Sequence, residues 1–454
     1  MKKSLIALAA LAATSAFAQS SVTLYGRAEA GVDLGYRSTT TSSSSGFSVV
    51  GGVASPVATA VGPTSVDKPG FRVQDGNSQG QGSSRIGFRG TEDLGGGLKA
   101  NFVMEMGVRI DEGCVNGNGA ITNGPTGAAI TPCTSGNSGG ATNSNNALFG
   151  RASWVGLSGG FGEVRLGRQV LGSFGVHANG LAAGASNGLY EVGAGIVQGG
   201  VRFANAIQYR SPDFGGISGT ISLAAPEGQN TSTANVGLVP DTTDTKFKTG
   251  IDLSIAYANG PIYVGFGYNQ TGNTTTTNNN EAGVANANTF LDAKVTDFAI
   301  SAAYDLGVAQ PFFSYVNRKN AGGIGNVTGA TFTNTASAAA NAKTKQYAFG
   351  VKVPVGPATL IAAFGNTKTN GSGTVVNQAG LFSASTLEAK TRAFQIGAMY
   401  PLSKRTTLQA NYGINNTKTN GATVTPTGVN SFTATGSASE TKIRALNFGV
   451  AHTF

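Results

Sequence analysis

The segment Leu98-Lys-Ala-Asn-Phe-Val-Met-Glu-Met-Gly-Val-Arg-Ile110 decides how the rest of this chain is interpreted. Apolar side chains occupy every second position from Leu98 to Ile110, and Lys99, Glu105 and Arg109 lie between them. Alternation with a period of two predicts a β-strand with one apolar and one polar face. The segment is longer than the usual strand of a soluble protein, and its length suits a tilted crossing of a membrane.

The same alternation returns along the chain, at 251–257, 262–268, 298–304, 347–353, 360–364, 394–400 and 408–414. Aromatic residues gather toward the ends of these segments, as expected where a membrane meets water, at Tyr257, Tyr268, Tyr304, Tyr400 and Phe454. We therefore expect an all-β protein, a transmembrane antiparallel β-barrel.

The connections alternate between short and long, as outer-membrane barrels require. Short turns rich in Gly, Pro, Asp and Asn are predicted at 93–97, 159–162, 211–216, 259–261, 305–307, 355–357 and 401–405. Long loops are predicted at 38–82, 111–147, 169–203, 226–249, 271–292, 319–343, 369–389 and 419–439. These connections join about sixteen strands, although fourteen or eighteen also fit, and they place Ser21 and Phe454 on the same side.

The first residues have the pattern of a secretory signal peptide. Lys2 and Lys3 precede an apolar run from Leu5 to Ala13, and Ala16-Phe-Ala18 offers small residues for a signal peptidase. The run is too short for a membrane-spanning helix. We expect residues 1–18 to be cleaved after Ala18 and residues 19–454 to form a single barrel domain.

Composition and charge argue against several other classes of protein. The chain has 31 basic and 22 acidic residues, but only 12% of its residues are charged and no run of Lys and Arg suggests a nucleic-acid partner. With only two histidines, His177 and His452, a hydrolase of the Ser-His-Asp type is disfavoured. No grouping of carboxylates and histidines suggests a metal site, and we expect neither a cofactor nor an enzyme activity. Cys114 and Cys133 lie in a Gly/Asn/Ser/Thr-rich stretch and are candidates for a disulfide in an oxidising compartment.

Several motifs resemble the general porins of Gram-negative bacteria, particularly those of betaproteobacteria. They are Ser21-Val-Thr-Leu-Tyr-Gly-Arg27, the segments 84–100, 148–151, 154–157, 162–169 and 209–216, and the ending Val450-Ala-His-Thr-Phe454. The resemblance implies an outer-membrane barrel of sixteen strands, a homotrimer, and a third long loop folded into the lumen. It also implies a pore for small anions and hydrophilic solutes, contact with outer-membrane lipid including lipopolysaccharide, and recognition of Phe454 by the barrel-assembly machinery.

Strand parity predicts which charged side chains face the lumen. Val22, Leu24 and Ala28 share one face of the first strand, so Arg27 should point inward with Tyr25 and Glu29. In the second strand Ile86 and Phe88 are expected to point outward, so Arg85 and Arg89 should point inward. By the same reasoning Arg151 should point inward because Ala152 and Trp154 are expected to point outward, and Arg210 because Ile207 and Tyr209 are. By resemblance, Arg27, Arg85, Arg151 and Arg210 form the basic wall of the constriction. Arg168 matches a family arginine too, although it has the parity of Val164 and Leu166, which face lipid, so we expect it at a strand end.

The third long loop is poor in acids. Between 171 and 200 it carries Glu191 and His177, and it lacks the proline-acid motif of many relatives. Glu191 is either an acid of the constriction or a solvated loop residue, and His177 is expected to be an ordinary loop residue. The pore should therefore prefer anions, because arginine rings favour them.

Two other functions remain as alternatives. The chain could be a surface adhesin or receptor whose long loops bind partners. A sugar-specific channel would need aromatic residues along the lumen, and beyond Tyr25 and Tyr263 the inward faces contain few.

Overall fold

The computed structural model describes residues 21–50, 53–56, 64–67, 70–75, 84–111, 114–115, 148–180, 202–226, 229–236, 239–279, 287–328, 341–376, 382–428 and 431–454. Within these ranges, no helix has the length and apolar character needed to cross a membrane.

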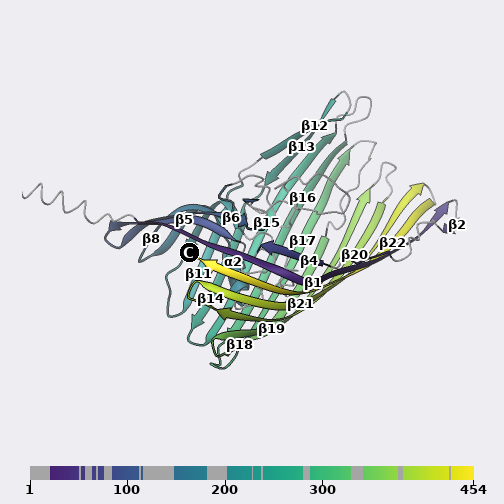
Figure 1. Cartoon of the computed structure of the whole chain (residues 1–454). Coiled ribbons are helices and arrows are strands. Elements are labelled where there is room, and N and C mark those ends of the chain that lie inside the picture. The colour runs from purple at the N-terminus through teal and green to yellow at the C-terminus, as the bar shows by residue number, and fades with distance from the viewer. Residues whose placement is uncertain are drawn as a thin grey trace, which may run out of the picture.

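The strands close into an antiparallel barrel (Figure 1). Around the wall they are β1 (Ser21–Val50), β5 (Arg85–Gly95), β6 (Leu98–Arg109), β8 (Ala152–Gly159), β9 (Gly162–Val170), β10 (Arg202–Arg210), β11 (Ile217–Ala224), β14 (Gly250–Asn259), β15 (Ile262–Asn279), β16 (Ala287–Tyr304), β17 (Gln310–Thr328), β18 (Asn341–Val355), β19 (Ala358–Val376), β20 (Phe382–Pro401), β21 (Thr406–Gly428) and β22 (Ser431–Thr453). Each pairs with the next, and β22 pairs back with β1, so the described residues form a wall of sixteen strands, as predicted.

The two ends of the wall meet at Gly26 and Phe454. The Gly26 amide donates to the carbonyl oxygen of Phe454 at 3.0 Å, and the Phe454 amide donates to that of Gly26 at 3.1 Å. Closure matters because lipid cannot hydrogen-bond an unpaired strand edge.

The wall is apolar outside and polar inside, the reverse of a soluble protein. Outward side chains such as Val155, Ile207 and Phe349 are more than half exposed, whereas Gln208 and Gln395 on the inner face are fully buried. This distribution confirms the alternation in the sequence and leaves lipid as the medium that covers the outer face.

The predicted short turns are confirmed, and side-chain oxygens support them. Asp93 accepts from the amide of Gly95, and Asp305 accepts from the amide of Gly307, in both cases with a glycine at positive φ. Such Asx turns reverse the chain within a few residues.

Several of the predicted long loops are shorter than expected, whereas 111–147 and 169–203 agree with the observed strand ends to within a few residues. β15 and β16 stay paired as far as Asn279 and Ala287, and β21 and β22 as far as Gly428 and Ser431. Their outer parts are rich in Thr and Asn, so they lack the apolar alternation that marks a strand in the sequence, although threonine favours extended strands. Shorter strands lie in other connections: β2 (Val53–Pro56), β3 (Thr64–Asp67), β4 (Gly70–Asp75), β7 (Cys114–Val115), β12 (Gln229–Val236) and β13 (Val239–Phe247).

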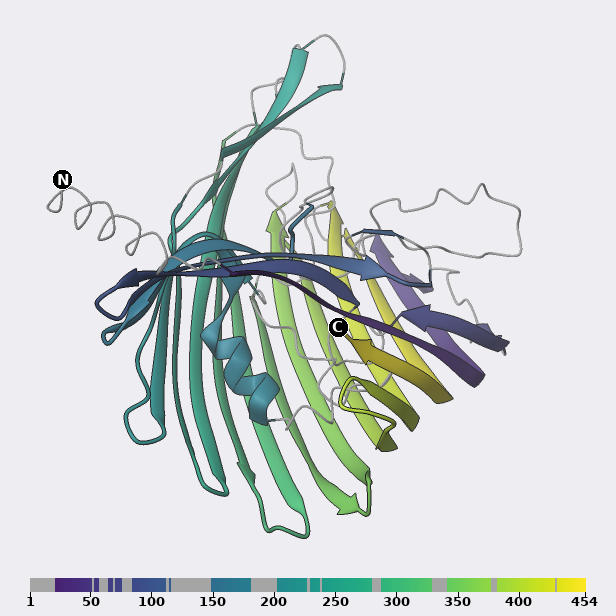
Figure 2. The ribbon, with the colours of Figure 1, turned by 60° about the vertical axis from the view of Figure 1, so that its left-hand side comes forward.

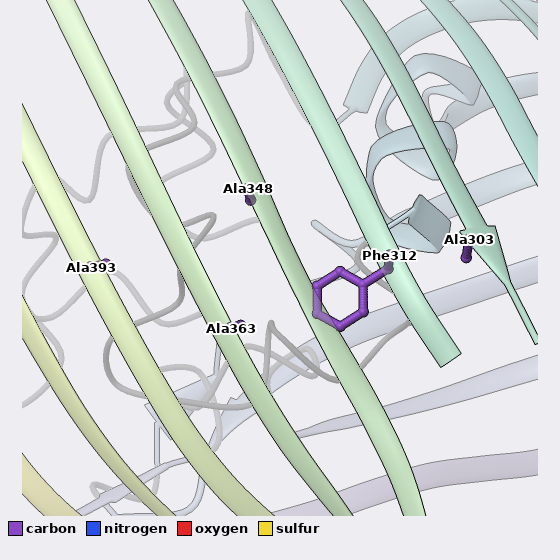
Figure 3. Packing of buried hydrophobic residues seen from close by; sticks show 5 residues of the cluster. All are labelled: Ala303, Phe312, Ala348, Ala363 and Ala393. Atoms are coloured by element: carbon purple, nitrogen blue, oxygen red, sulfur yellow. The ribbon is translucent and has the colours of Figure 1, made fainter. Parts of the chain in front are cut away.

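One part of the inner wall carries a small apolar cluster. Figure 3 shows Phe312 of β17 lying along the sheet toward β18, among the alanines of neighbouring strands. A side chain at Gly350 would lie 2.5 Å from the Phe312 ring, so glycine makes room for that ring. The cluster comprises Ala303, Phe312, Ala348, Ala363 and Ala393.

Candidate functional site: the charged lumen wall

The inner face of β1, β5, β6, β8, β9 and β10 carries a dense group of arginines and carboxylates. The helix α2 (Gly172–Gly180) follows β9 directly and lies inside the barrel, where it contacts β11, β14, β15, β16 and β17 (Figure 2). The charged strands and the helix therefore occupy different sectors of one lumen.

Arg27 and Arg85 face inward on adjacent strands, as parity predicts. They are opposed in the register of β1 and β5. Arg27 is bonded to the buried Glu29 two residues further along β1, and Gln409 of β21 donates to the same carboxylate at 2.6 Å. Glu29 therefore holds Arg27 against the wall and ties the first strands to the last ones.

Glu105 of β6 joins three side chains, one from β1, one from β5 and one from the residue that precedes β8. Its carboxylate accepts from Arg151 at 2.7 Å and from the hydroxyl of Tyr25 at 3.0 Å, and it forms an ion pair with Arg85 at 3.6 Å. Arg89 lies over the Tyr25 ring, 5.1 Å from its centroid, which adds a cation–π contact. One carboxylate thus orients several cations at the same level of the lumen.

The parity prediction for the fourth strand of the wall, β8, was wrong. Val155 is paired with Leu166 and both are exposed outward, so Ala152 and Trp154 have the inward parity instead. Arg151 precedes β8, where alternation has not begun, and it reaches the lumen by bonding Glu105. The predicted orientation of Arg151 is therefore observed, but for a different reason.

Arg168 lies near the end of β9, beside a register shift between β9 and β10. Its guanidinium donates to the carbonyl oxygen of Gly150 at 2.7 Å. Arg202, half-buried at the start of β10, lies close enough to Arg151 and Arg168 for the like charges to repel one another. From the sequence, Arg202 was expected in a loop, and only the close approach of β8, β9 and β10 reveals that it belongs to this group.

A second charged group lies nearer the short turns. Arg210 of β10 donates to Gln208 at 3.0 Å, and the neighbouring Arg165 is bonded to Glu163 at 2.5 Å. Arg165 also stacks on the Trp154 ring, with 3.9 Å between its guanidinium carbon and the ring centroid. This stack engages a tryptophan that was expected, from parity, to face lipid.

The amino-terminal end of α2 is held by a single carboxylate. Asp252 of β14 accepts from the amides of Gly172 at 2.8 Å and of Ser173 at 3.3 Å, and it also bonds the Ser173 hydroxyl. A carboxylate there satisfies orphan amides and complements the helix dipole.

The next turn of α2 is anchored to the wall as well. The Val176 carbonyl oxygen accepts from Ser301 at 2.6 Å and from Tyr263 at 3.2 Å. His177, expected to be an ordinary loop residue, is instead a buried helical residue whose Nδ1 lies 2.7 Å from the Ser314 hydroxyl. Burial lowers the pKa of His177 to about 4, so the ring is neutral near pH 7.

Some predicted residues lie outside the described part of the chain. Glu191 and Cys133 are among these, and of Cys114 only the backbone position in β7 is described. Among the described residues, no group of three or more His, Cys, Asp or Glu side chains could hold a metal ion.

The described wall carries more positive than negative charge. Eight arginines on or beside these inner faces outnumber four carboxylates, leaving an excess of four (Arg27, Arg85, Arg89, Arg151, Arg165, Arg168, Arg202 and Arg210 against Glu29, Asp33, Glu105 and Glu163). An excess of fixed positive charge on a lumen wall attracts anions.

Comparisons with known proteins agree with this architecture. The profile of a family described as Gram-negative porin matches residues 4–420. The chain is 29% identical to outer membrane porin protein 32 of Delftia acidovorans, over 90% of this chain and 88% of that protein. It is 28% identical to an outer membrane porin protein of Bordetella pertussis, over 91% of this chain and 94% of that protein. Among solved structures, an anion-selective porin from Comamonas acidovorans superposes with a TM-score of 0.53 at 22% identity, over 96% of this chain and all of that one.

Proposed function

The chain belongs to the Gram-negative porin family, and on that premise we propose that its pore is a general diffusion channel that favours anions. The protein is an outer-membrane porin, and its relatives are channels rather than enzymes. What remains to be assigned is which solutes the pore favours and which side chains decide this.

The excess of arginine on the lumen wall carries the proposal. Fixed charges in a narrow, water-filled channel raise the local concentration of counter-ions and lower the barrier to their passage. Glu29 and Glu105 orient Arg27, Arg85 and Arg151, but two carboxylates do not cancel the positive charge of three arginines. The anion selectivity in the name of the porin from Comamonas acidovorans agrees with this direction.

The helix α2 supplies no opposing charge. Its nine residues contain no acid, and its single basic side chain, His177, is neutral near pH 7. The helix therefore narrows its sector of the lumen without creating the acidic counterpart that would favour cations.

Assembly and export belong to the same proposal. The chain assembles as a homotrimer after cleavage of residues 1–18, and the assembly machinery recognises Phe454 during insertion. The position of Phe454 at the closing seam supports the last point, since its backbone pairs with Gly26.

The decisive experiment is the zero-current potential of the purified trimer in a planar bilayer under a KCl gradient. A potential displaced toward the chloride limit is expected. A potential displaced toward the potassium limit would overturn the anion preference, and folded trimer without conductance steps would favour the adhesin function instead.

A further inference from the structure

Trp154 of β8 presents its indole ring to the lumen, in a sector where most neighbouring inward side chains are polar or charged. It is opposed to Val103 of β6 on one side and to Gly167 of β9 on the other, and all three have inward parity. The ring is only half-buried, and Trp154 is the single tryptophan of the chain. A large ring on the wall of a water-filled pore can contact the solutes that pass it.

Arg89 of β5 lies on the far side of Val103 from this tryptophan. The register opposes Arg89 to Val103 and Val103 to Trp154, so the three residues form one line across β5, β6 and β8. Neighbouring strands are about 4.8 Å apart, which separates the backbones of Arg89 and Trp154 by about 10 Å. The short side chain of Val103 leaves an apolar floor between them. We call Arg89, Val103 and Trp154 the tryptophan row.

Each end of the tryptophan row carries an arginine stacked on an aromatic ring. The guanidinium carbon of Arg89 lies 5.1 Å from the centroid of the Tyr25 ring, and that of Arg165 lies 3.9 Å from the centroid of the Trp154 ring. Stacking on a ring restrains a guanidinium group and leaves its planar fork of donors at the edge. The row therefore presents flat apolar surfaces and oriented cations side by side.

The polar groups of the row have unused bonding capacity. Arg89 is exposed and, in the part of the chain that the structure describes, its guanidinium group has no carboxylate within ion-pair distance and no hydrogen-bond acceptor. The nearest acid along β6, Glu105, is already paired with Arg85 and Arg151. The indole N–H of Trp154 has no acceptor among the described residues either.

These properties select the chemistry of a matching solute. A carboxylate satisfies a guanidinium fork with two parallel hydrogen bonds. A planar ring covers the apolar floor at Val103 and can stack against an indole or a guanidinium group. A halide or phosphate ion would leave the apolar floor in contact with water, and a sugar would leave Arg89 without a counter-charge. A ring that bears a carboxylate meets both requirements.

We propose that the tryptophan row is a subsite for aromatic carboxylates, which bind there transiently as they cross the pore. The carboxylate is placed on Arg89, and the ring is placed over Val103 against Trp154. The inference rests on the proposed function, because it names one class of solute for a pore that favours anions. Such a site must bind weakly enough to release the solute, since conduction requires both entry and exit.

The fluorescence of the folded barrel in detergent tests this site, because its tryptophan signal comes from Trp154 alone. The probes are benzoate and cyclohexanecarboxylate, which have the same charge and nearly the same size but differ in planarity. The half-saturating concentration should be about fivefold lower for benzoate, owing to stacking. Equal half-saturation by the two acids would overturn the proposal, and so would an equal response to glucose, which would indicate a sugar site.

Two glutamine variants separate the subsite from the general field of the wall. Arg89→Gln should raise the half-saturating concentration of benzoate about tenfold, because a charge-assisted pair is lost. It should leave that of benzyl alcohol, an uncharged aromatic probe, unchanged. Arg210→Gln removes the same charge from the same wall outside the row, and should weaken benzoate by about twofold at most. Equal effects of both variants on benzoate would overturn the site.

The role of the ring is read from single-channel recordings, in which each acid lowers the KCl conductance as it occupies the pore. Trp154→Leu should abolish the preference for benzoate over cyclohexanecarboxylate, whereas Trp154→Phe should keep part of it. An undiminished preference in the leucine variant would overturn the role of Trp154. All these outcomes compare one probe with another, whereas the anion preference is measured by the KCl reversal potential. A potential near the chloride limit with equal binding of both acids would therefore overturn the subsite alone.

Discussion

Arg27 and Arg85 lie opposite one another in the antiparallel pair of β1 and β5, with both side chains on the inner face of the barrel. Each is paired with a carboxylate, Arg27 with Glu29 and Arg85 with Glu105, which Arg85 shares with Arg151. Two like charges in opposed positions would destabilise the pairing without these acids. The pair shows how the wall keeps guanidinium groups oriented toward the lumen while its net charge stays positive.

The double change Arg27→Gln and Arg85→Gln should weaken the anion preference. It removes two of the eight arginines and lowers the excess over the four carboxylates from four to two. The chloride-to-potassium permeability ratio from the KCl reversal potential should fall by about twofold or more. Arg392→Gln with Arg444→Gln on the outer face is the matched control, and an equal effect there would contradict the assignment.

Glu105→Gln should have the opposite electrical effect and a cost in stability. Arg85 and Arg151 lose a common counter-charge, so the reversal potential should move closer to the chloride limit. Loss of the charge-assisted bonds should lower the free energy of unfolding by about 2 kcal/mol, measured by urea titration of the barrel in detergent. Tyr25→Phe removes one hydrogen bond to Glu105 without changing any charge, so its reversal potential should equal that of the wild type.

Asp252→Asn should loosen the start of α2. The neutral amide still offers an oxygen to the amides of Gly172 and Ser173, but it loses the charge that complements the helix dipole. We expect more open-channel current noise in single-channel recordings, from a less firmly held helix. Asp213→Asn, in the turn after β10, is the control, and identical noise in both variants would show that Asp252 does not hold the helix.

Lowering the pH should weaken the packing of α2 against the barrel wall, because it protonates His177. Its pKa of about 4 in the folded barrel lies below the ordinary value of 6.5, so protonation opposes the buried position. The stabilisation is complete above pH 6.5 and is lost as the pH falls toward 4. Current noise and brief closures should therefore increase across this window.

His177→Gln keeps a neutral group that can bond Ser314 and does not titrate. It should remove the pH dependence between 6.5 and 4. An unchanged dependence in this variant would assign the effect to other groups.

Gly26→Ala should impair closure of the barrel. A methyl group there would lie 2.6 Å from the carbonyl oxygen of Arg85 and 2.4 Å from the ring of Phe454, so backbone would have to move. The folded fraction, seen as the heat-modifiable band on a gel, should fall clearly below that of the wild type. Gly219→Ala is the control because its nearest neighbour is 3.5 Å away, and equal yields would show that the seam tolerates the methyl group.

The sequence by itself determined the properties that depend on local alternation. A period of two within one strand decides which side chains share a face. Arg27, Arg85 and Arg210 could therefore be directed inward, and the alternate apolar residues Leu98, Ala100, Phe102, Met104 and Met106 could be placed together on the opposite face. The turns at Asp93 and Asp305 were equally predictable, because their Asx geometry involves neighbours in the chain.

The tertiary structure decided where each strand begins and which residues oppose one another. A shift of one residue reverses every face, which is why Trp154 was directed to the wrong side and Arg151 to the right side for a reason that does not hold. The position of α2 inside the barrel depends on Asp252 and Ser314. These residues bond Ser173 and His177, which are 79 and 137 residues away in the chain. Likewise, only the register of four strands brings Lys345, Lys368, Lys390 and Lys418 into one line, because strand pairing, not spacing along the chain, places them opposite one another.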